Sequence, residues 1–305
     1  MQEEQIKKLN IYIPNTSRAG QIGGGWTFLS NIRKALKDKV QFVDTWQECD
    51  IVFMFSVTTI DKSEIHNAIN GGKKLVLRVD NIPRKSRNRR ATPYKRLTEF
   101  GNRSALVVYQ SEWCKDYAGY FIDNENEIII NNGVDSDIFN KEDRSSDSKT
   151  YLYINYNDNP NKRFDEAMFQ FEMMWREDND IKLVIAGNAP RIYLENPEYY
   201  WDLNVEADIT YAGITNTPEE TAELMKTCDY LLYPSFAEAY PNTVLEALAC
   251  GMKIECVNDE GGTKEAIENS MHYYDTTFGS SYDYRPKTIE KMGEEYLKAF
   301  NEIIK

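Results

Sequence analysis

The stretch YLLYPSFAEAYPNTVLEALACG, residues 230–251, is the most informative part of the chain. Its apolar start predicts a buried strand that ends at Pro234-Ser235. A short loop then carries Glu238, and Pro241 is well placed to start a helix that contains Glu246 about one and a half turns in. The stretch therefore predicts two carboxylates and a helix N-terminus at the carboxyl end of a strand.

This combination favours one kind of ligand. The unpaired backbone N–H groups at a helix start form an anion site, which the helix dipole supports. A carboxylate beside that site can accept two hydroxyl hydrogen bonds at once, which suits the vicinal diols of ribose and hexose. The pattern thus predicts a ligand with phosphate in its middle and a polyol at each end.

Strand-length apolar runs alternate with helical patterns on both sides of this stretch. We predict strands at 9–14, 51–56, 74–79, 105–109 and 127–130, and again at 150–155, 181–186, 208–212, 230–234 and 253–257. We predict second-half helices at 163–176, 217–227, 242–250 and 263–268. Apolar strands between helices indicate parallel sheets covered on both faces.

A polar segment divides the chain into two halves. Residues 140–149 read NKEDRSSDSK and contain no strongly apolar residue, as a linker does. We therefore expect an α/β protein with two Rossmann-like domains, 1–142 and 150–280, that face a central cleft. An amphipathic helix is expected over 286–305, with Ile289, Met292, Tyr296 and Phe300 in its stripe.

Composition narrows the class of protein. The 305 residues carry a formal net charge of −13, which disfavours a nucleic-acid binder. The start MQEEQIKK has no signal-peptide stretch, no apolar run approaches the roughly 20 residues that span a bilayer, and five cysteines fit no disulfide or zinc framework. We expect a cytoplasmic protein with free thiols. Because the chain has only two histidines, neither a histidine-based metal site nor a serine–histidine hydrolase is favoured.

The spacing of Glu238 and Glu246 resembles the Glu-x7-Glu signature of the retaining glycosyltransferases of family 4 and their GT-B relatives. Further segments follow the family's order: NNGVDSDIF at 131–139, NPNKRFDEA at 159–167, LVIAGN at 183–188, TYAGI at 210–214 and EGGTKEAI at 260–267. The resemblance covers roughly 127–270 and extends only loosely over the first domain.

The resemblance implies a fold and a reaction. The fold is GT-B, with the donor domain second and the helix over 286–305 crossing back to the first domain. The reaction, a step of glycan biosynthesis, moves a hexosyl unit with retention from a UDP- or GDP-linked sugar to a hydroxyl of a glycan, a lipid or a small molecule. No metal ion or other cofactor is expected.

Roles for acidic and basic residues also come from the resemblance. Glu238 is expected to contact the donor sugar, and Glu246 to hold the ribose hydroxyls. Lys162, helped by Arg163, is expected to neutralise the diphosphate as it departs, because fixed charges aimed at developing charge lower a barrier. Asn157 departs from the family, which often has an arginine there. Either Arg163 supplies this charge or donor binding is weaker.

The remaining donor contacts are backbone groups. The resemblance implies that the N–H groups around Tyr240, Asn242 and Thr243 hold the phosphates. Gly187 and Gly213 lie on the two strands that flank the base pocket in the family.

Gly23, Gly24 and Gly25 follow the first strand, and glycine lets a backbone approach a ligand closely. In the resembled family this loop lines the cleft near the donor phosphates, so Gly24 and Gly25 are candidate donor contacts. The alternative interpretation is a plain strand–helix turn.

Residues 78–96 hold eight basic residues and one acid, Asp80. One interpretation is an electropositive lip that attracts an anionic acceptor or rests on the acidic inner face of a membrane. The other is a solvated loop that pairs with acids elsewhere. Asp80 follows a strand, where catalytic residues of open α/β sheets gather, and is a candidate for catalysis. An ion pair with Arg78 is its structural alternative.

Two other functions fit the same fold. A sugar-nucleotide epimerase needs acid and base residues, of which this histidine-poor chain offers few. A non-catalytic module that binds nucleotide sugars is the second alternative, and Asn157 and the short first domain favour it.

Overall fold

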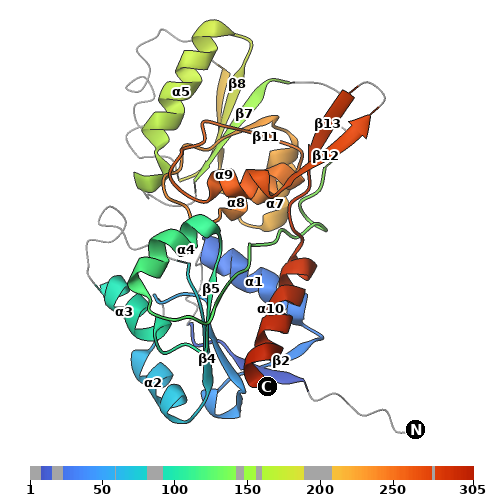
Figure 1. Ribbon diagram of the computed structural model, residues 1–305. Coiled ribbons are helices and arrows are strands. Elements are labelled where there is room, and N and C mark those ends of the chain that lie inside the picture. Colours follow the sequence, from blue (N-terminus) through green and yellow to red (C-terminus); the bar gives the residue numbers. More distant parts are fainter. Residues whose placement is uncertain are drawn as a thin grey trace. The chain divides into compact units, whose positions relative to one another are not determined.

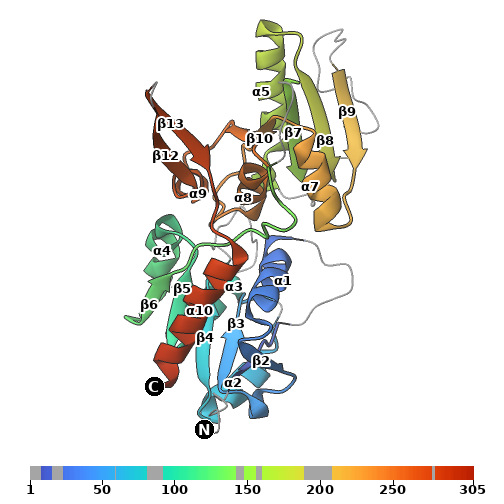
Figure 2. The ribbon, with the colours of Figure 1, turned by 90° about the vertical axis from the view of Figure 1, so that its right-hand side faces the viewer.

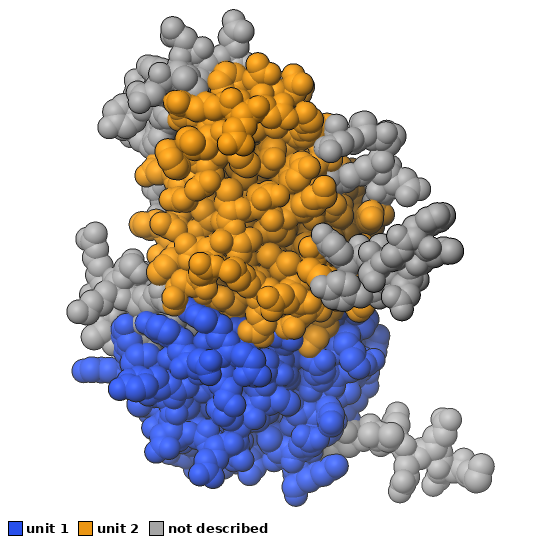
Figure 3. Space-filling view, turned by 45° about the horizontal axis from the view of Figure 1, so that its top comes forward, with its two compact units in different colours: residues 1–133, 288–305 blue, residues 134–287 orange. Residues whose placement is uncertain are grey.

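The computed structural model describes residues 8–15, 23–58, 60–80, 92–141, 148–155, 160–188, 208–276 and 279–305. The chain forms two compact units, Met1–Gly133 with Thr288–Lys305, and Val134–Lys287, which Figure 3 colours separately. The division at Gly133 comes nine residues before the predicted boundary at 142. Its reason is that Val134 and Phe139 are buried in the core of the second unit.

The first unit is built on a six-stranded sheet of order β2-β1-β3-β4-β5-β6 (Figure 1). Every neighbouring pair in this sheet is parallel. Its strands are β1 (Leu9–Tyr12), β2 (Val40–Val43), β3 (Ile51–Met54), β4 (Lys74–Arg78), β5 (Leu106–Tyr109) and β6 (Glu127–Ile129).

The strand order decides which face each helix of the first unit covers. The helices are α1 (Gly24–Leu36), α2 (Lys62–Asn70), α3 (Thr92–Gly101), α4 (Glu112–Ala118) and α10 (Ile289–Ile304), with 3-10 turns η1 (Trp46–Glu48) and η2 (Gly119–Phe121). From β3 to β6 the chain steps in one direction, and from β1 to β2 in the other. Right-handed crossovers therefore put α2, α3 and α4 on one face and α1 on the opposite face.

Helix α10 lies beside α1, as Figures 1 and 2 both show. Its stripe of Ile289, Met292, Tyr296 and Phe300 shares one core with residues of α1 and of the sheet. At Gly293 an added Cβ would lie 2.7 Å from Ala35 Cβ, so the two helices approach closely there. The C-terminal helix is therefore part of the first unit's core.

The second unit has a five-stranded parallel sheet of order β11-β10-β7-β8-β9. Its strands are β7 (Thr150–Asn155), β8 (Lys182–Gly187), β9 (Asp208–Gly213), β10 (Tyr230–Leu232) and β11 (Lys253–Glu255). An antiparallel hairpin of β12 (Met271–Thr276) and β13 (Gly279–Tyr284) follows. The α/β fold with parallel sheets agrees with the prediction.

Helices cover both faces of the second sheet. They are α5 (Phe164–Glu177), α7 (Pro218–Lys226), α8 (Asn242–Ala249) and α9 (Thr263–Glu268), with the 3-10 turn η3 (Pro160–Lys162). Side chains alternate along β7, so Leu152 and Ile154 pack with α7, α8 and α9, while Tyr153 packs with α5. This double cover leaves the carboxyl edge of the sheet as the place for functional loops.

Candidate functional site

The carboxyl edge of the second sheet collects most of the predicted donor residues. Strands β7 and β10 are hydrogen-bonded neighbours, and the segments that follow them carry Lys162 and Glu238. Strands β8 and β9 end at Gly187 and Gly213. Residues far apart in sequence therefore share one edge, because all these strands run in parallel.

Lys162 and Glu238 form an ion pair at this edge. The distance between Lys162 Nζ and Glu238 Oε1 is 3.2 Å. Their side chains are 20% and 13% exposed, so the pair is largely withdrawn from water but still reachable. A largely desolvated ammonium interacts strongly with an anionic ligand, and the carboxylate beside it can accept hydrogen bonds from hydroxyl groups.

Backbone hydrogen bonds fix the loop that carries Glu238. Ala237 N donates to Glu260 O, and Gly262 N donates to Glu238 O, both at 2.8 Å. Ala237 has a φ of 59°, a left-handed conformation that costs energy for a residue with a side chain. The segment after β11 thus holds a strained loop in one conformation, and with it the position of the carboxylate.

Gly261 allows this contact. It has a φ of 129°, and an added Cβ would lie 3.0 Å from both the N and the O of Glu238. Only glycine combines this backbone conformation with so close an approach. Glycine at this position is therefore required by the Glu238 loop.

Two tyrosines contact Lys162, one at its backbone and one at its ammonium. The Tyr153 hydroxyl donates to the Lys162 backbone oxygen at 3.2 Å. The Lys162 ammonium lies 5.6 Å from the centroid of the Tyr233 ring, within cation–π range. The lysine is thus positioned through both its backbone and its charge.

Arg163 lies beside Lys162 but has a different environment. It adopts a left-handed φ of 51° at the start of α5. Its guanidinium is 3.8 Å from Glu166 Oε2 and 5.9 Å from the centroid of the Phe236 ring. Arg163 is therefore shared between an acid on its own helix and the loop that leads to Glu238.

Helix α8 begins at Asn242, the first residue of the predicted range 242–250. Pro241 is its N-cap and provides no side-chain cap. The first hydrogen bond of the helix runs from Leu245 N to Pro241 O at 3.4 Å. The N–H groups of Asn242 and Thr243 precede that bond and lie in the first turn of the helix, where the helix dipole favours an anion.

Tyr240 contributes its side chain to the core. The ring is buried with residues of α8, and its hydroxyl accepts a hydrogen bond from Asn269 Nδ2 at 3.5 Å. Burial raises the pKa of Tyr240 to about 12. A ligand contact at this position is therefore left to the backbone.

Glu246 is half-buried on α8, and burial raises its pKa from an ordinary 4.5 to about 7. Its carboxylate makes no hydrogen bond or ion pair with any residue that the structure describes. A carboxylate in this state gains from hydroxyl donors, because hydrogen bonds to the charged form offset the cost of burial.

The two strand-end glycines differ in their surroundings. Gly187 has a φ of 90°, and an added Cβ would lie 1.8 Å from Asn155 O, while Asn188 N donates to the same oxygen at 2.6 Å. Gly213 has a φ of 77°, but no atom of a described residue lies within 4 Å of an added Cβ there. Gly187 thus serves close backbone packing, and Gly213 leaves open space.

In the first unit, Gly25 and Asp80 are neighbours. An added Cβ on Gly25 would lie 3.3 Å from Phe55 Cε2 and 3.9 Å from Asp80 Oδ2. Gly24 is the first residue of α1, and within the described part of the chain nothing lies within 4 Å of its added Cβ. The glycine turn and the candidate acid therefore occupy the carboxyl edge of that sheet together.

Arg78, two residues before Asp80, is fully buried. It donates to Gln110 Oε1 at 2.6 Å and to Asn132 Oδ1 at 2.9 Å, and it stacks 3.8 Å from the centroid of Phe28. Burial lowers its pKa from the ordinary value, and nearby Asp80 opposes that effect. Gln110 also donates to Val79 O at 2.7 Å, so the network fixes the backbone that leads to Asp80.

Some predictions lie outside the described residues. These are Asn157 and residues 81–91 of the basic segment 78–96. Within the described ranges, no three His, Cys, Asp or Glu side chains are grouped as a metal site would need. No helix in the same ranges has the length and apolar character for crossing a membrane.

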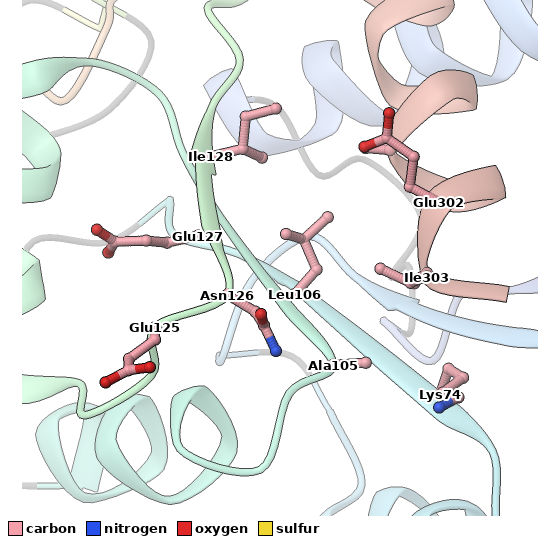
Figure 4. A pocket seen from close by; sticks show the side chains of 10 residues that line it. Lys74, Ala105, Leu106, Glu125, Asn126, Glu127, Ile128, Glu302 and Ile303 are labelled. Carbon is pink, nitrogen blue, oxygen red and sulfur yellow. The ribbon is translucent and has the colours of Figure 1, made fainter. Parts of the chain in front are cut away.

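A pocket of about 570 Å³ lies in the first unit, away from these groups (Figure 4). Lys74, Leu106 and Glu127, the first residues of β4, β5 and β6, line it together with Glu302 and Ile303 of α10. It is therefore at the amino edge of the sheet, opposite the edge where ligands of open α/β sheets bind.

The second unit matches a known protein family. Residues 134–274 match the family model described as glycosyl transferases group 1. That range contains Lys162, Glu238 and Glu246, and it coincides with most of the second unit.

Two curated proteins match shorter parts of the chain. The chain is 29% identical over 86 residues to N-acetylgalactosamine-N,N'-diacetylbacillosaminyl-diphospho-undecaprenol 4-alpha-N-acetylgalactosaminyltransferase of Campylobacter jejuni. It is 30% identical over 94 residues to alpha-monoglucosyldiacylglycerol synthase of Streptococcus pneumoniae. These matches cover 28% and 30% of this chain, and 22% and 21% of the relatives.

A solved structure matches nearly the whole chain. Anabaena HepE, in complex with UDP and glucose, has a TM-score of 0.67, with 97% of this chain and 92% of that chain covered. At 15% identity this likeness concerns the fold alone. The fold is GT-B.

Sequence reasoning did not single out Tyr153, Tyr233 or Gly261. Tyr153 and Tyr233 stand in strand-like apolar runs, where a tyrosine is indistinguishable from core. The glycine pair of EGGTKEAI was noted, but its contact with Glu238 depends on how two loops meet.

Proposed function

We propose that this protein is a retaining glycosyltransferase that moves a hexosyl unit from a UDP- or GDP-linked sugar to a hydroxyl group of a glycan, a lipid or a small molecule. The observation that carries the proposal is the Lys162–Glu238 ion pair at the carboxyl edge of the second sheet. The match of residues 134–274 to group 1 glycosyltransferases and the names of the relatives support it.

Each group has a part in this chemistry. When the bond between the anomeric carbon and the diphosphate breaks, negative charge grows on the diphosphate. Lys162 and the N–H groups that open α8 are donors of the kind that stabilise such charge. Glu238 accepts hydroxyl hydrogen bonds from the sugar, and Glu246 accepts those of the ribose diol.

The donor is proposed from chemistry and from likeness. HepE structures hold UDP or UDP-glucose, which favours a nucleoside diphosphate sugar here. We propose that the reaction proceeds without a metal ion, with Lys162 and Arg163 supplying the positive charge. Asp80 and Gly25, which are neighbours in the first unit, are proposed to serve the acceptor side.

The test is a panel of UDP- and GDP-linked hexoses, with melting temperature read first. A donor present at 100 times its dissociation constant should stabilise the protein by about 2.7 kcal/mol. The stabilising donor is then incubated with acceptors in the presence of a chelator, and the product's anomeric configuration is determined by NMR.

Glu238→Gln and Lys162→Met are the decisive variants. Transfer that both variants abolish supports the proposal, with Lys253→Met, a lysine on the opposite edge of the sheet, as the matched control. Binding of donor without any turnover by the wild type would identify a non-catalytic module. Conversion of donor alone into its epimer would identify an epimerase.

A further inference from the structure

Tyr233 directly follows β10, one residue before the Pro-Ser turn that leads to Glu238. It is 3% exposed and packs in the core of α7, α8 and α9. Its backbone N donates to Glu255 O at 2.9 Å, which continues the pairing of β10 with β11. The residue is therefore rigidly held at the carboxyl edge of the sheet.

The hydroxyl of Tyr233 lies among the charged groups of the site. The Lys162 ammonium is 5.6 Å from its ring centroid. Burial raises the pKa of Tyr233 to about 12, an effect that Lys162 opposes and Glu238 reinforces. The phenol is therefore close to both members of the ion pair and remains protonated at any physiological pH.

This hydroxyl is buried, and no described residue meets both the distance and the angle of a hydrogen bond with it, although Ser235 and Lys162 lie near enough to lower its pKa as hydrogen-bond donors. An unmade hydrogen bond is costly for a buried polar group. Tyr109 and Tyr296 of the first unit share that property, whereas Tyr153 and Tyr240 of the second unit have partners. Among these tyrosines only Tyr233 combines an unmade hydrogen bond with a place beside Lys162 and Glu238.

We propose that the Tyr233 hydroxyl donates a hydrogen bond to the diphosphate of the sugar donor, next to the charge contact made by Lys162. This inference rests on the proposed function. A phosphate oxygen is the favoured acceptor because Lys162 has only protons to offer to the phenol oxygen, so the phenol proton points away from it. The ring holds the ammonium through its face, and the hydroxyl serves the ligand.

The same strand provides a matched control. Tyr230 stands three residues earlier, at the amino end of β10, with the Lys253 ammonium 5.2 Å from its ring centroid. Tyr230→Phe and Tyr233→Phe thus remove a hydroxyl from the first residue of β10 and from the residue that follows β10, each with a lysine over its ring. Only Tyr233 lies at the edge that carries Lys162 and Glu238.

The experiment measures the affinity of the full-length variants for UDP and GDP by calorimetry, and then kcat/KM with the active donor. Tyr233→Phe is expected to weaken binding of the preferred nucleotide by tenfold to about a hundredfold, the range for a hydrogen bond to a charged group. Its melting temperature without nucleotide should change little, because no described residue holds the lost hydroxyl at full hydrogen-bond geometry. Tyr230→Phe should match the wild type.

Two outcomes would overturn the inference. One is wild-type nucleotide affinity in Tyr233→Phe, and the other is a loss of affinity together with a lower melting temperature, which signals a structural role. Lys162→Met separates this failure from that of the proposed function. If Lys162→Met weakens nucleotide binding and Tyr233→Phe does not, only the inference about Tyr233 fails. If neither variant changes binding, the proposed function fails as well.

Discussion

At the scale of single residues, the proposed role of Glu246 makes donor binding depend on pH. Its pKa of about 7 lies above the ordinary 4.5, so the folded protein without ligand loses stability as pH rises from about 4.5 to about 7. A diol, in contrast, binds best to the ionised form. The two effects oppose each other, and ligand binding is expected to lower the pKa of this carboxyl.

The first prediction follows from that sign. If only ionised Glu246 holds the ribose, the donor's dissociation constant should fall by about tenfold between pH 6 and pH 8. Calorimetric titration of UDP or GDP across this range provides the measurement. Glu246→Gln should bind more weakly at pH 8 and should show a flat profile over the same range. An unchanged slope in that variant would assign the titration to another group.

Gly261 lies against the backbone of Glu238, so its substitution should disturb the site. A side chain in Gly261→Ala would press against both backbone polar atoms of Glu238, each 3.0 Å from the new Cβ. We expect transfer activity to fall by at least tenfold, since shifting a positioned group by a fraction of an ångström costs rate. Gly72→Ala is a suitable control, because Gly72 also has a positive φ, 79°, but has no neighbour within 4 Å and lies in the first unit.

At the scale of elements, alanine substitution of the two glycines that end β8 and β9 distinguishes the cost of backbone strain from that of a steric clash. Gly213→Ala adds only the strain of a positive φ, about 1–2 kcal/mol. Gly187→Ala adds the same strain and a Cβ 1.8 Å from Asn155 O on β7, so the strands have to separate. Urea unfolding should show a much larger loss for Gly187→Ala. Equal losses would mean that the β7–β8 edge yields easily.

Much of the element pattern was predictable from local signals. Thr217 caps α7 by accepting from Glu220 N at 3.2 Å, with Pro218 next, as the sequence pattern indicates. Ser111 likewise caps α4 by accepting from Cys114 N at 2.9 Å. Such signals concern neighbours along the chain, which is why sequence spacing is enough to find them.

Other elements carry too little local signal. Strand β2 (Val40–Val43) has only four residues and was not predicted. Nor was the pairing of β12 with β13, whose sequences MHYYDT and GSSYDY are largely polar. Glu238 could be singled out because it follows a buried strand, and Lys162 through the family resemblance, but their ion pair was not predicted. The Tyr233 hydroxyl was not singled out, because its position beside Lys162 and Glu238 arises only in the folded unit.

At the scale of the whole molecule, the first unit is built from two distant segments. Phe300 of α10 is fully buried with Phe53 and Tyr296, at ring distances of 5.3 Å and 5.8 Å. Phe300→Ala should therefore destabilise the first unit by about 3–5 kcal/mol, measured by urea unfolding. Lys298→Ala on the same helix is the control, since its side chain is 80% exposed and should change stability little.

The second unit, in contrast, is one continuous segment. Its first and last residues are joined, because Val134 N donates to Lys287 O at 2.8 Å. We predict that residues 134–287 expressed alone fold and bind the preferred nucleoside diphosphate within about tenfold of the full chain. Thermal unfolding with and without UDP or GDP tests this. A segment that folds but does not bind would assign part of the nucleotide site to the first unit.

The chain leaves the first unit after Gly133 and returns to it at Thr288, and the closeness of these two points has a practical consequence. A Cβ added at Gly133 would lie 2.5 Å from Thr288 O, so the two backbone segments that connect the units lie in direct contact. A foreign nucleotide-binding cassette with equally close ends therefore needs only two peptide junctions to replace residues 134–287. Such a replacement leaves every core contact of α10 in place. Under the proposed function, it offers a route to changing the sugar donor by gene fusion while the first unit keeps its sequence.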